Sequence, residues 1–315
     1  MLIESIRTQL SRSLILTLFF IVGCASTSNK EATDISLKTK RFGHAAVNDG
    51  RLIYIIAGSN SSGFLSDIEV FNPKTGAIEV LENKVIPRRY FSAVFDGKQS
   101  IYIIGGVSLI DNKVAYEKRV EVFNTVTKTV SLASNLPAPT RINTAVMVEQ
   151  DIWVFGGAHP ANGKLIASNL VAKYNVDSNS WRRLDNMPSR KTTRAIVKDN
   201  KVYLAGGYNR KHSLNEFQRF DPKSGNWQPM PPLPKKVSAH SAVIANEKLH
   251  LFGDYNELDL VLTYDFSSRK WSEANIPYIK SRHNAATALD GIVYVIGGTQ
   301  GTSGPALNYI QSFKL

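Results

Sequence analysis

The sequence predicts an all-β protein built from one repeated unit. A β-rich apolar run that ends in Gly-Gly or a close variant occurs six times, with successive copies about 44 to 51 residues apart. No stretch shows sustained helical periodicity, and short apolar runs bounded by turn residues are typical of strands. A period in this range indicates a repeat architecture. The six copies occupy residues 52–58, 101–106, 152–157, 202–207, 249–254 and 293–298.

A second apolar run follows each copy and contains an aromatic residue, usually with Asn or Asp directly after it. Because Asn and Asp favour tight turns, this run predicts a strand that ends in a turn. Five units have a further apolar residue seven positions after the aromatic, which predicts the next strand. The five pairs are Phe71 and Ile78, Phe123 and Val130, Tyr174 and Trp181, Phe220 and Trp227, and Tyr264 and Trp271. With an alternating first strand, such as residues 44–47, each unit is expected to contain four strands.

These features resemble the Kelch family of β-propellers, whose repeats combine an Arg, a Tyr-x-x-Gly-Gly strand end, an Asp or Asn turn and a Trp. The resemblance covers about residues 34–315 and implies a six-bladed β-propeller. The last repeat stops at Leu315, just after its third strand. We therefore expect residues 32–37 to add as the outer strand of the last blade. Such a strand would close the ring and cover exposed strand edges.

Residues 1–23 have the pattern of an export signal. Arg7 and Arg12 precede an apolar run of about nine residues, which is too short to span a bilayer as a helix. Residues 21–24 resemble the lipobox of bacterial lipoproteins, and this resemblance implies a lipid on Cys24. Residues 24–33 would then form a flexible tether. The alternative is a signal peptide with an incidental cysteine.

The lipobox resemblance implies a protein of the bacterial cell envelope held by a lipid anchor, and Ala25 favours the outer membrane. Cys24 is the only cysteine, which excludes an intramolecular disulfide. The formal net charge of +12 favours anionic partners, although a basic surface that is merely solvated is an equally open interpretation. Nucleic acid is not an expected partner in the envelope.

Cationic residues just before the first strands are the main candidates for binding. If the connections between blades surround one end of the channel, these residues would line its opening, where guanidinium groups suit carboxylate or phosphate. The alternative is that they hold neighbouring blades together, as an Arg often does in the Kelch pattern. The candidates are Arg41, Arg88, Arg89, Arg141, Arg190 and Arg282, with Lys235 and Lys236 in the fifth repeat.

The fifth repeat departs from the others. His250 stands where the other repeats have Tyr or Trp, and Asp254 replaces the second glycine. Departures of this kind can mark functional sites, so His250 is a binding candidate, while Asp254 and Glu257 are candidate ligand contacts or general bases. Simple drift of a degenerate repeat is the alternative. The basic loop at residues 208–216 is a further candidate for binding an anionic polymer.

Two hypotheses for function follow. The first is a non-catalytic module, expected to be a monomer, that binds an anionic glycan or the acidic segment of an envelope protein. The second rests on a resemblance to the N-acetylneuraminate epimerase (sialic acid mutarotase) family. That resemblance implies that Arg141 or Arg190 would hold the sugar carboxylate and that Glu257 or Asp254 would move the proton. We expect neither metal nor cofactor, because the histidines are scattered and no GxSxG, P-loop or HExxH motif occurs.

Overall fold

The computed structural model describes residues 35–302 and 304–315, and every regular element within them is a β-strand. No helix of these residues is long and apolar enough to cross a membrane. Six four-stranded sheets carry the fold, and we number them along the chain. Sheet 1 contains β2 (Ala45–Asn48), β3 (Ile53–Ile56), β6 (Ile68–Phe71) and β7 (Ile78–Leu81). Sheet 2 contains β9 (Ser92–Phe95), β10 (Ser100–Ile104), β13 (Val120–Asn124) and β14 (Val130–Ala133). Sheet 3 contains β15 (Thr144–Val148), β16 (Asp151–Phe155), β19 (Val171–Asn175) and β20 (Ser180–Arg183). Sheet 4 contains β21 (Thr192–Lys198), β22 (Lys201–Tyr208), β23 (Phe217–Phe220) and β24 (Trp227–Pro229). Sheet 5 contains β25 (Ser241–Ala245), β26 (Lys248–Phe252), β27 (Val261–Asp265) and β28 (Lys270–Glu273). Sheet 6 contains β29 (Ala285–Leu289), β30 (Ile292–Ile296), β31 (Leu307–Phe313) and β1 (Ser36–Arg41).

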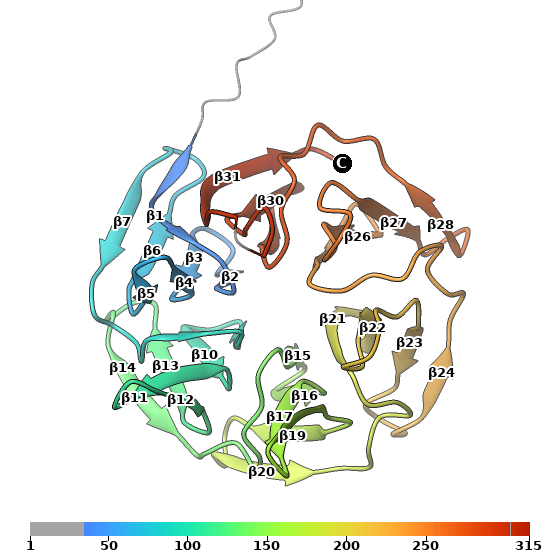
Figure 1. Ribbon diagram of the computed structural model, residues 1–315, viewed down its shortest axis with the longest axis horizontal. Helices are drawn as coiled ribbons and strands as arrows, with labels where there is room; N and C mark the ends of the chain where they lie inside the picture. The colour runs from blue at the N-terminus through green and yellow to red at the C-terminus, as the bar shows by residue number, and fades with distance from the viewer. Residues whose placement is uncertain (1–34, 303) are drawn as a thin grey trace, which may run out of the picture. The chain divides into compact units, whose positions relative to one another are not determined.

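The sheets are arranged around a common centre, with one strand of each sheet nearest to it (Figure 1). These innermost strands are β2, β9, β15, β21, β25 and β29. Each contacts the innermost strand of the next sheet, and β29 contacts β2. In sheets 1 to 5 the strands follow the order predicted for one repeat: innermost strand, glycine-ending strand, aromatic strand and outer strand.

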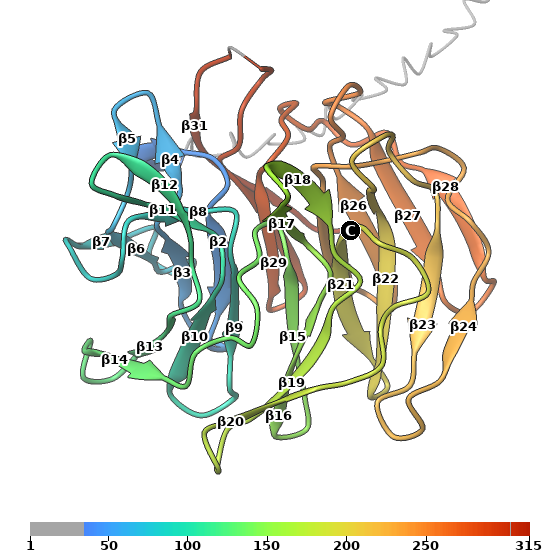
Figure 2. The same cartoon turned by 60° about the horizontal axis from the view of Figure 1, so that its bottom comes forward.

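Short hairpins extend the loops at one end of the sheets. Figure 2 shows three of them at the upper end of the molecule, and a short strand pairs with one of these hairpins. They are β4 (Ser59–Asn60) with β5 (Gly63–Phe64), β11 (Val107–Ile110) with β12 (Lys113–Tyr116) and the added strand β8 (Arg88–Arg89), and β17 (Ala158–Ala161) with β18 (Lys164–Ala167). The functional site described below lies at this end.

Strand β1 pairs with β31 in sheet 6, but it begins later than the sequence predicts. The expected strand was residues 32–37, of which residues 32–34 lie outside the described residues. Two backbone donors fix the later position, because the N–H groups of Lys38 and Thr39 donate to the Glu69 carboxylate of sheet 1 at 2.7 and 2.9 Å. Leu37 and the Arg41 side chain are buried by the same register.

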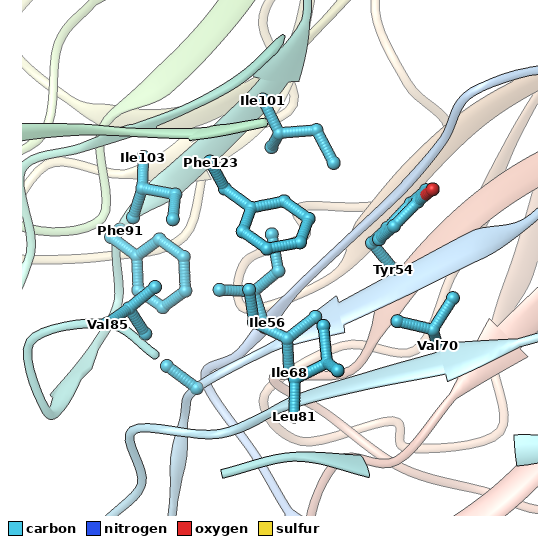
Figure 3. Packing of buried hydrophobic residues seen from close by; sticks show 11 residues of the cluster. Tyr54, Ile56, Ile68, Val70, Leu81, Val85, Phe91, Ile101, Ile103 and Phe123 are labelled. Atoms are coloured by element: carbon cyan, nitrogen blue, oxygen red, sulfur yellow. The ribbon is translucent and has the colours of Figure 1, made fainter. Parts of the chain in front are cut away.

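Apolar side chains fill the spaces between neighbouring sheets. Figure 3 shows the cluster between sheets 1 and 2, in which Tyr54 and Ile68 of sheet 1 meet Ile101 and Phe123 of sheet 2. The Tyr54 and Phe123 rings lie 5.9 Å apart between centroids. Burying one such side chain stabilises the fold by roughly 1.5–3 kcal/mol. The core is therefore distributed over the sheet interfaces, as expected for a repeat in which each unit packs on the next.

The paired glycines allow neighbouring backbone segments to approach closely. At Gly207 φ is 122°, and a Cβ atom there would lie 1.8 Å from the backbone oxygen of Thr192. A side chain at this position would therefore need both an unfavourable backbone conformation and a shift of the neighbouring strand. This requirement explains why the sequence repeats glycine at the ends of the second strands.

Buried polar residues occupy one matching position ahead of several innermost strands. His44, Asn143 and His240 approach the first glycine of the pair in another sheet, at Gly297, Gly105 and Gly206 respectively. Burial lowers the pKa of His44 and of His240 to about 3, and nearby Arg charges act in the same direction. Both histidines are therefore neutral at physiological pH, and the Asn in other repeats shows that the position needs no charge. His44 and His240 therefore occupy a structural position of the repeat.

Candidate functional site

A cavity of about 850 Å³, which we call the mouth, opens at the end of the sheets that carries the hairpins, and its lining includes Ala158 and Leu165 of the β17–β18 hairpin. The segments that lead into the innermost strands line part of it, and the loops between second and third strands line the rest. Every sheet contributes one residue or more from its entry segment. These entry residues include Phe42, Tyr90, Ile142, Thr192, Ala239 and His283.

A belt of backbone hydrogen bonds joins five of the six entry segments. Its members have φ between 52° and 62°, a conformation that is rare for residues other than glycine. The N–H of Tyr90 donates to the oxygen of Gly43 and the N–H of Ile142 donates to the oxygen of Tyr90, both at 2.7 Å. The belt continues from Gly43 towards sheets 6 and 5. The N–H of Gly43 donates to the backbone oxygen of His283 at 2.9 Å, and the N–H of His283 donates to the backbone oxygen of Ala239 at 2.8 Å. The belt brings the Tyr90 and His283 rings together at the centre, 5.0 Å apart between centroids.

Guanidinium groups of the mouth lie over aromatic rings. Arg141 lies 4.8 Å from the centroid of Tyr90, and Arg282 lies 3.7 Å from the centroid of Tyr255. The guanidinium of Arg89 also lies over the Tyr90 ring, 5.0 Å from its centroid. Arg282 also donates to the backbone oxygen of Tyr255 at 2.7 Å. Cation–π contacts orient a guanidinium without neutralising its charge, so these groups keep their positive charge for a ligand.

The residues that line the mouth include six cationic side chains and no carboxylate: Arg89, Arg141, Arg210, Lys211, Lys236 and Arg282. Within residues 35–302 and 304–315, the salt bridges within 4.0 Å involve none of these six. The Nε atoms of Arg89, Arg141 and Arg282 are buried without a hydrogen-bond partner. A buried donor without a partner is unfavourable, so these three side chains carry a cost that the fold tolerates at the mouth.

The buried histidine of the mouth, His283, adds no positive charge at physiological pH. Burial lowers the pKa of His283 to about 3, and the charges of Arg194, Arg282, Arg141 and Arg89 act in the same direction. His283 is therefore neutral above that pH. Burial also lowers the pKa of Arg194, on β21, to about 10, which leaves it charged at neutral pH. Among the described residues, no group of three or more His, Cys, Asp or Glu could hold a metal ion.

Two family descriptions match the chain, each over more than half of its length. The KLHDC2/KLHL20/DRC7 Kelch-repeats domain matches residues 143–315, and the Attractin/LZTR1 beta-propeller matches residues 51–211. The chain belongs to the Kelch-repeat β-propeller family. The resemblance drawn from the repeated motifs is therefore confirmed at the level of the family.

Curated relatives share the Kelch region at low identity. Kelch-like protein terF of Aspergillus terreus is 24% identical over 230 residues, which are 67% of this chain and 50% of that protein. Kelch repeat and BTB domain-containing protein 12 of Homo sapiens is 26% identical over 180 residues, 49% of this chain and 29% of that protein. Beta-scruin of Limulus polyphemus is 25% identical over 247 residues, 72% of this chain and 26% of that protein. The chain thus spans half or less of the length of these relatives.

The cations ahead of the first strands occupy two adjacent positions of the Kelch repeat, not one. Residues of the second position form a bridge with the residue that directly follows the glycine pair or its variant. These bridges are Phe42 with Ser59, Arg89 with Val107, Arg141 with Ala158, Thr192 with Tyr208, and Arg282 with Thr299. Arg41, Arg88 and Lys191 stand one residue earlier, at the first position. Because neighbouring residues of an extended chain point to opposite sides, only the second position faces the mouth.

The first-position cations are buried in ion pairs. Arg41 is 0% exposed and donates to Asp67 and Glu69, each at 2.6 Å. Arg88 is also 0% exposed and pairs with Glu121 at 2.6 Å. The expectation that Arg41 and Arg88 would line the mouth is therefore wrong in placement. Arg41, on β1 of sheet 6, pairs with carboxylates of sheet 1 and so joins two neighbouring sheets, whereas Arg88 pairs with a carboxylate of sheet 2. A signal for this arrangement was present, because Glu occurs as the second residue of the third strand in the same two repeats.

In the fourth sheet, too, the cation at the first position is buried in an ion pair. Lys191 is buried and pairs with Glu216 at 2.7 Å, whereas Arg190, the predicted site residue, is exposed. Arg190 does not line the mouth but a separate, smaller cavity with Arg183 and His159. The placement of Arg190 in the ring of cations is therefore also incorrect. Arg190 stands one residue before the first position, which Lys191 occupies.

The candidates in the fifth repeat lie outside the lining of the mouth. His250 is buried on β26, where Nδ1 contacts the Thr263 hydroxyl at 3.0 Å and the ring fills the aromatic position of the repeat. Asp254 is buried and accepts backbone N–H bonds from Ser238 at 2.7 Å and from Asn256 at 2.9 Å. Its carboxylate therefore holds the loop in place. Glu257 pairs instead with Lys235 at 2.7 Å and is about half exposed.

Several residues of the mouth were not predicted. Tyr90, Tyr255 and His283 belong to the site because the belt and the loop of sheet 5 place them there. No motif marked them, since an aromatic residue at a strand entry is common in any β-protein. The basic loop at residues 208–216 was a binding candidate, and Arg210 and Lys211 of that loop do line the mouth.

Proposed function

We propose that this protein is a binding module whose mouth takes up an acidic segment of a partner polypeptide. The observation that carries the proposal is the group of six cationic side chains around one cavity whose lining contains no carboxylate. Guanidinium groups bind carboxylates through paired, charge-assisted hydrogen bonds. Arg89, Arg141 and Arg282 line a partly enclosed space, where such bonds are stronger than in open solvent.

An acidic segment matches the mouth better than a single small anion does. The cationic side chains come from five different entry segments and loops, so their charges are distributed around the opening. A chain with several carboxylates can reach several of them at once. Exposed aromatic surface beside the charges, such as Tyr255 at 43% exposure, can pack against the apolar parts of the same segment. An anionic glycan is the other candidate and is one outcome of the test below.

We propose further that the six sheets are the blades of a six-bladed propeller and that β1 closes the ring. Two observations support this arrangement. The innermost strands contact one another in sequence, with β29 beside β2. Strand β1, from the start of the described chain, pairs with β31 at its end. Pairing the two ends of a chain in one sheet is a common way for a propeller to remain closed.

The alternative of a sugar-acid mutarotase draws no support from the candidate acids. Asp254 accepts three backbone N–H bonds, from Ser238, Asn256 and Glu257, so its lone pairs are already engaged. Glu257 is paired with Lys235 and does not line the mouth. Neither carboxylate is placed to move a proton of a ligand held by Arg141. The relatives named above are not described as epimerases.

The location in the cell also remains a proposal. The export signal, the lipidated Cys24 and the tether to residue 33 all lie outside the described residues. The motif at residues 21–24 supports a lipid-anchored protein of the bacterial envelope, most simply at the outer membrane. We therefore propose an acidic envelope protein as the partner. Labelling cells with a radioactive fatty acid, with and without Cys24→Ser, tests the anchor directly.

The binding proposal is tested with a labelled hexaglutamate peptide as the probe. We expect the full chain to bind it, and Arg141→Ala and Arg282→Ala to weaken binding by about 10- to 100-fold, because each removes a charge-assisted bond of roughly 1.5–3 kcal/mol. Arg182→Ala is the matched control. It removes one exposed positive charge on β20, outside the mouth, and should leave the affinity nearly unchanged.

Each result has a definite meaning. Equal weakening by Arg141→Ala and Arg182→Ala would contradict the mouth as the site and point to a general effect of surface charge. Binding of a polysialic acid fragment in place of hexaglutamate would favour the glycan. Exchange of N-acetylneuraminate anomers above the buffer rate, followed by NMR, would contradict a non-catalytic role.

A further inference from the structure

A small cavity of about 190 Å³ lies beside sheet 3 and shares no lining residue with the mouth. Its walls come from the approach to β15, from β17, from the loop before β19, and from the end of β20 with the chain that follows it. We call this cavity the sheet 3 pocket. Polar side chains in its lining include His159, Ser168, Asn169, Arg183, Asn186 and Arg190.

Two bridged segments border both the mouth and the sheet 3 pocket. Arg141 and Ala158 form a backbone bridge, and both line the mouth. Thr140 and His159, their neighbours in the chain, both line the sheet 3 pocket. Side chains alternate along an extended chain, so successive residues of these segments face different cavities. The two cavities are therefore distinct, although they share a wall of backbone.

The two arginines of the sheet 3 pocket are not neutralised by the described part of the chain. Its salt bridges within 4.0 Å involve neither Arg183 nor Arg190. The described lining of the pocket contains no Asp or Glu. Glu216, which holds the chain next to Arg190, is already engaged by Ser189 and Lys191, each at 2.7 Å. Two full positive charges therefore border this small space.

Neutral donors line the same space. Ser168 is only 7% exposed, and its hydroxyl oxygen accepts from the N–H of Leu170 at 3.1 Å, so the hydroxyl proton remains to be donated. The backbone N–H of Asn169 donates to no backbone oxygen among the described residues. The side-chain amides of Asn169 and Asn186 add further donors. Several donors beside two guanidinium groups suit an anion that has many acceptor oxygens.

The size and charge of the sheet 3 pocket favour a phosphate group over other anions. Pockets that enclose a whole small molecule measure about 300–1,000 Å³, so a cavity of about 190 Å³ suits a single chemical group. A phosphate monoester carries about −1.5 to −2 charge at neutral pH and three acceptor oxygens. That charge matches the two arginines. A carboxylate brings one charge and two oxygens, which would leave one guanidinium without a partner.

We propose that the sheet 3 pocket binds a phosphate group, either inorganic phosphate or the phosphomonoester of a small molecule. Arg183 and Arg190 pair with the phosphate oxygens, and the buried Ser168 and the neighbouring Asn169 donate to them. The rest of a phosphomonoester stays outside the pocket, in solvent. Arg190 thus has a binding role outside the mouth, and this role does not depend on the function proposed for the mouth.

Isothermal titration calorimetry of the full chain with inorganic phosphate and with glucose 6-phosphate tests this site. We expect Arg183→Ala and Arg190→Ala each to weaken phosphate binding by about tenfold or more, because each removes a charge-assisted bond. Both arginines are exposed, so neither change should lower the melting temperature. Arg182→Ala is the matched control, since Arg182 is exposed on the same strand but lies outside the pocket lining, and it should leave the affinity nearly unchanged.

The probes also identify the source of the phosphate group. Glucose 6-phosphate binding at least as tightly as inorganic phosphate would assign the pocket to a phosphomonoester, and binding of inorganic phosphate alone would assign it to the free ion. Acetate should bind at least about tenfold more weakly than phosphate, because it has a single charge. Acetate binding as tightly as phosphate would overturn the proposal, and so would the absence of binding by both phosphate probes.

Two further comparisons separate the sheet 3 pocket from the mouth. Phosphate binding that Arg141→Ala weakens and Arg183→Ala does not would place the ion in the mouth and overturn the proposal. Equal weakening by Arg182→Ala and Arg183→Ala would also overturn it, as a general effect of surface charge. Arg183→Ala combined with Arg190→Ala should leave hexaglutamate binding nearly unchanged, so failure of this proposal leaves the function proposed for the mouth unaffected.

Discussion

Arg88 and Arg89 are adjacent in the chain, yet their guanidinium groups lie in opposite environments. Arg88 is 0% exposed and pairs with Glu121 at 2.6 Å inside sheet 2. Arg89 lines the mouth, with its guanidinium 5.0 Å from the centroid of Tyr90 and without a carboxylate partner among the described residues. The alternation of side chains along strand β8 (Arg88–Arg89) produces this difference.

The difference shows how one repeat position can serve stability and its neighbour can serve binding. At the first position, Arg41, Arg88 and Lys191 each have a carboxylate partner, so their charge is neutralised within the fold. At the second position, Arg141 and Arg282 contact aromatic rings, which leave the charge available. Changes at the first position should therefore alter folding, and changes at the second should alter binding.

The largest expected effect comes from breaking a buried pair. Arg88→Ala leaves the buried Glu121 without its counter-charge, which should lower the free energy of unfolding by about 3–5 kcal/mol. Arg89→Ala removes no ion pair and should cost much less. Urea denaturation of the two variants measures the difference. Arg88→Leu combined with Glu121→Leu is the control, because removing both charges should recover most of the loss. Equal destabilisation by Arg88→Ala and Arg89→Ala would refute the division between the two positions.

Acid should lower the stability of the fold through its buried histidines. His44 is buried with its pKa lowered to about 3, whereas an unfolded chain has a His pKa near 6.5. Below pH 6.5 the unfolded state therefore binds a proton that the folded state does not. Stability is full above that pH and falls as the pH drops towards 3, by about 2 kcal/mol at pH 5 for this one residue.

His44→Asn tests this dependence, since Asn143 occupies the matching position in sheet 3. We expect the variant to lose less stability than the unmodified chain between pH 7 and pH 5, whatever its stability at pH 7. Thermal denaturation at several pH values gives the slope. His212→Asn, at an exposed position in the basic loop, is the control and should leave the slope unchanged. An unaltered slope in His44→Asn would show that this histidine does not govern the acid response.

Added salt should weaken binding at the mouth clearly. Of the changes considered, it should have the smallest effect on stability. Raising the salt concentration from 0.1 to 1 M shortens the screening length from about 10 to about 3 Å, which weakens interactions of accessible charges. Hexaglutamate binding at the mouth should fall by tenfold or more. The stability difference between Arg88→Ala and the unmodified chain should hardly change, because the pair is buried. Binding that does not depend on salt would contradict an electrostatic mouth.

Only some residues of the mouth could be predicted from the sequence. Arg89, Arg141 and Arg282 were predicted from their place before the first strands, and all three line the mouth. Arg41, Arg88 and Arg190 had the same signal and lie elsewhere, because a shift of one residue reverses the direction of a side chain. Tyr90 and His283 gave no signal, since backbone bonds between distant segments bring them to the centre.

The sequence by itself determined the all-β class, the six repeats, the strand order within a repeat and the family. These features follow from local patterns, namely alternating apolar residues, paired glycines and turn residues at fixed spacing. Only the tertiary structure decided which cation faces the mouth and which is buried in an ion pair. Those outcomes depend on register and on contacts between residues such as Arg41 and Glu69, which are far apart in the chain and meet only when the sheets assemble. Local pattern sets the strand, whereas the packing of one sheet against the next sets the environment of each side chain.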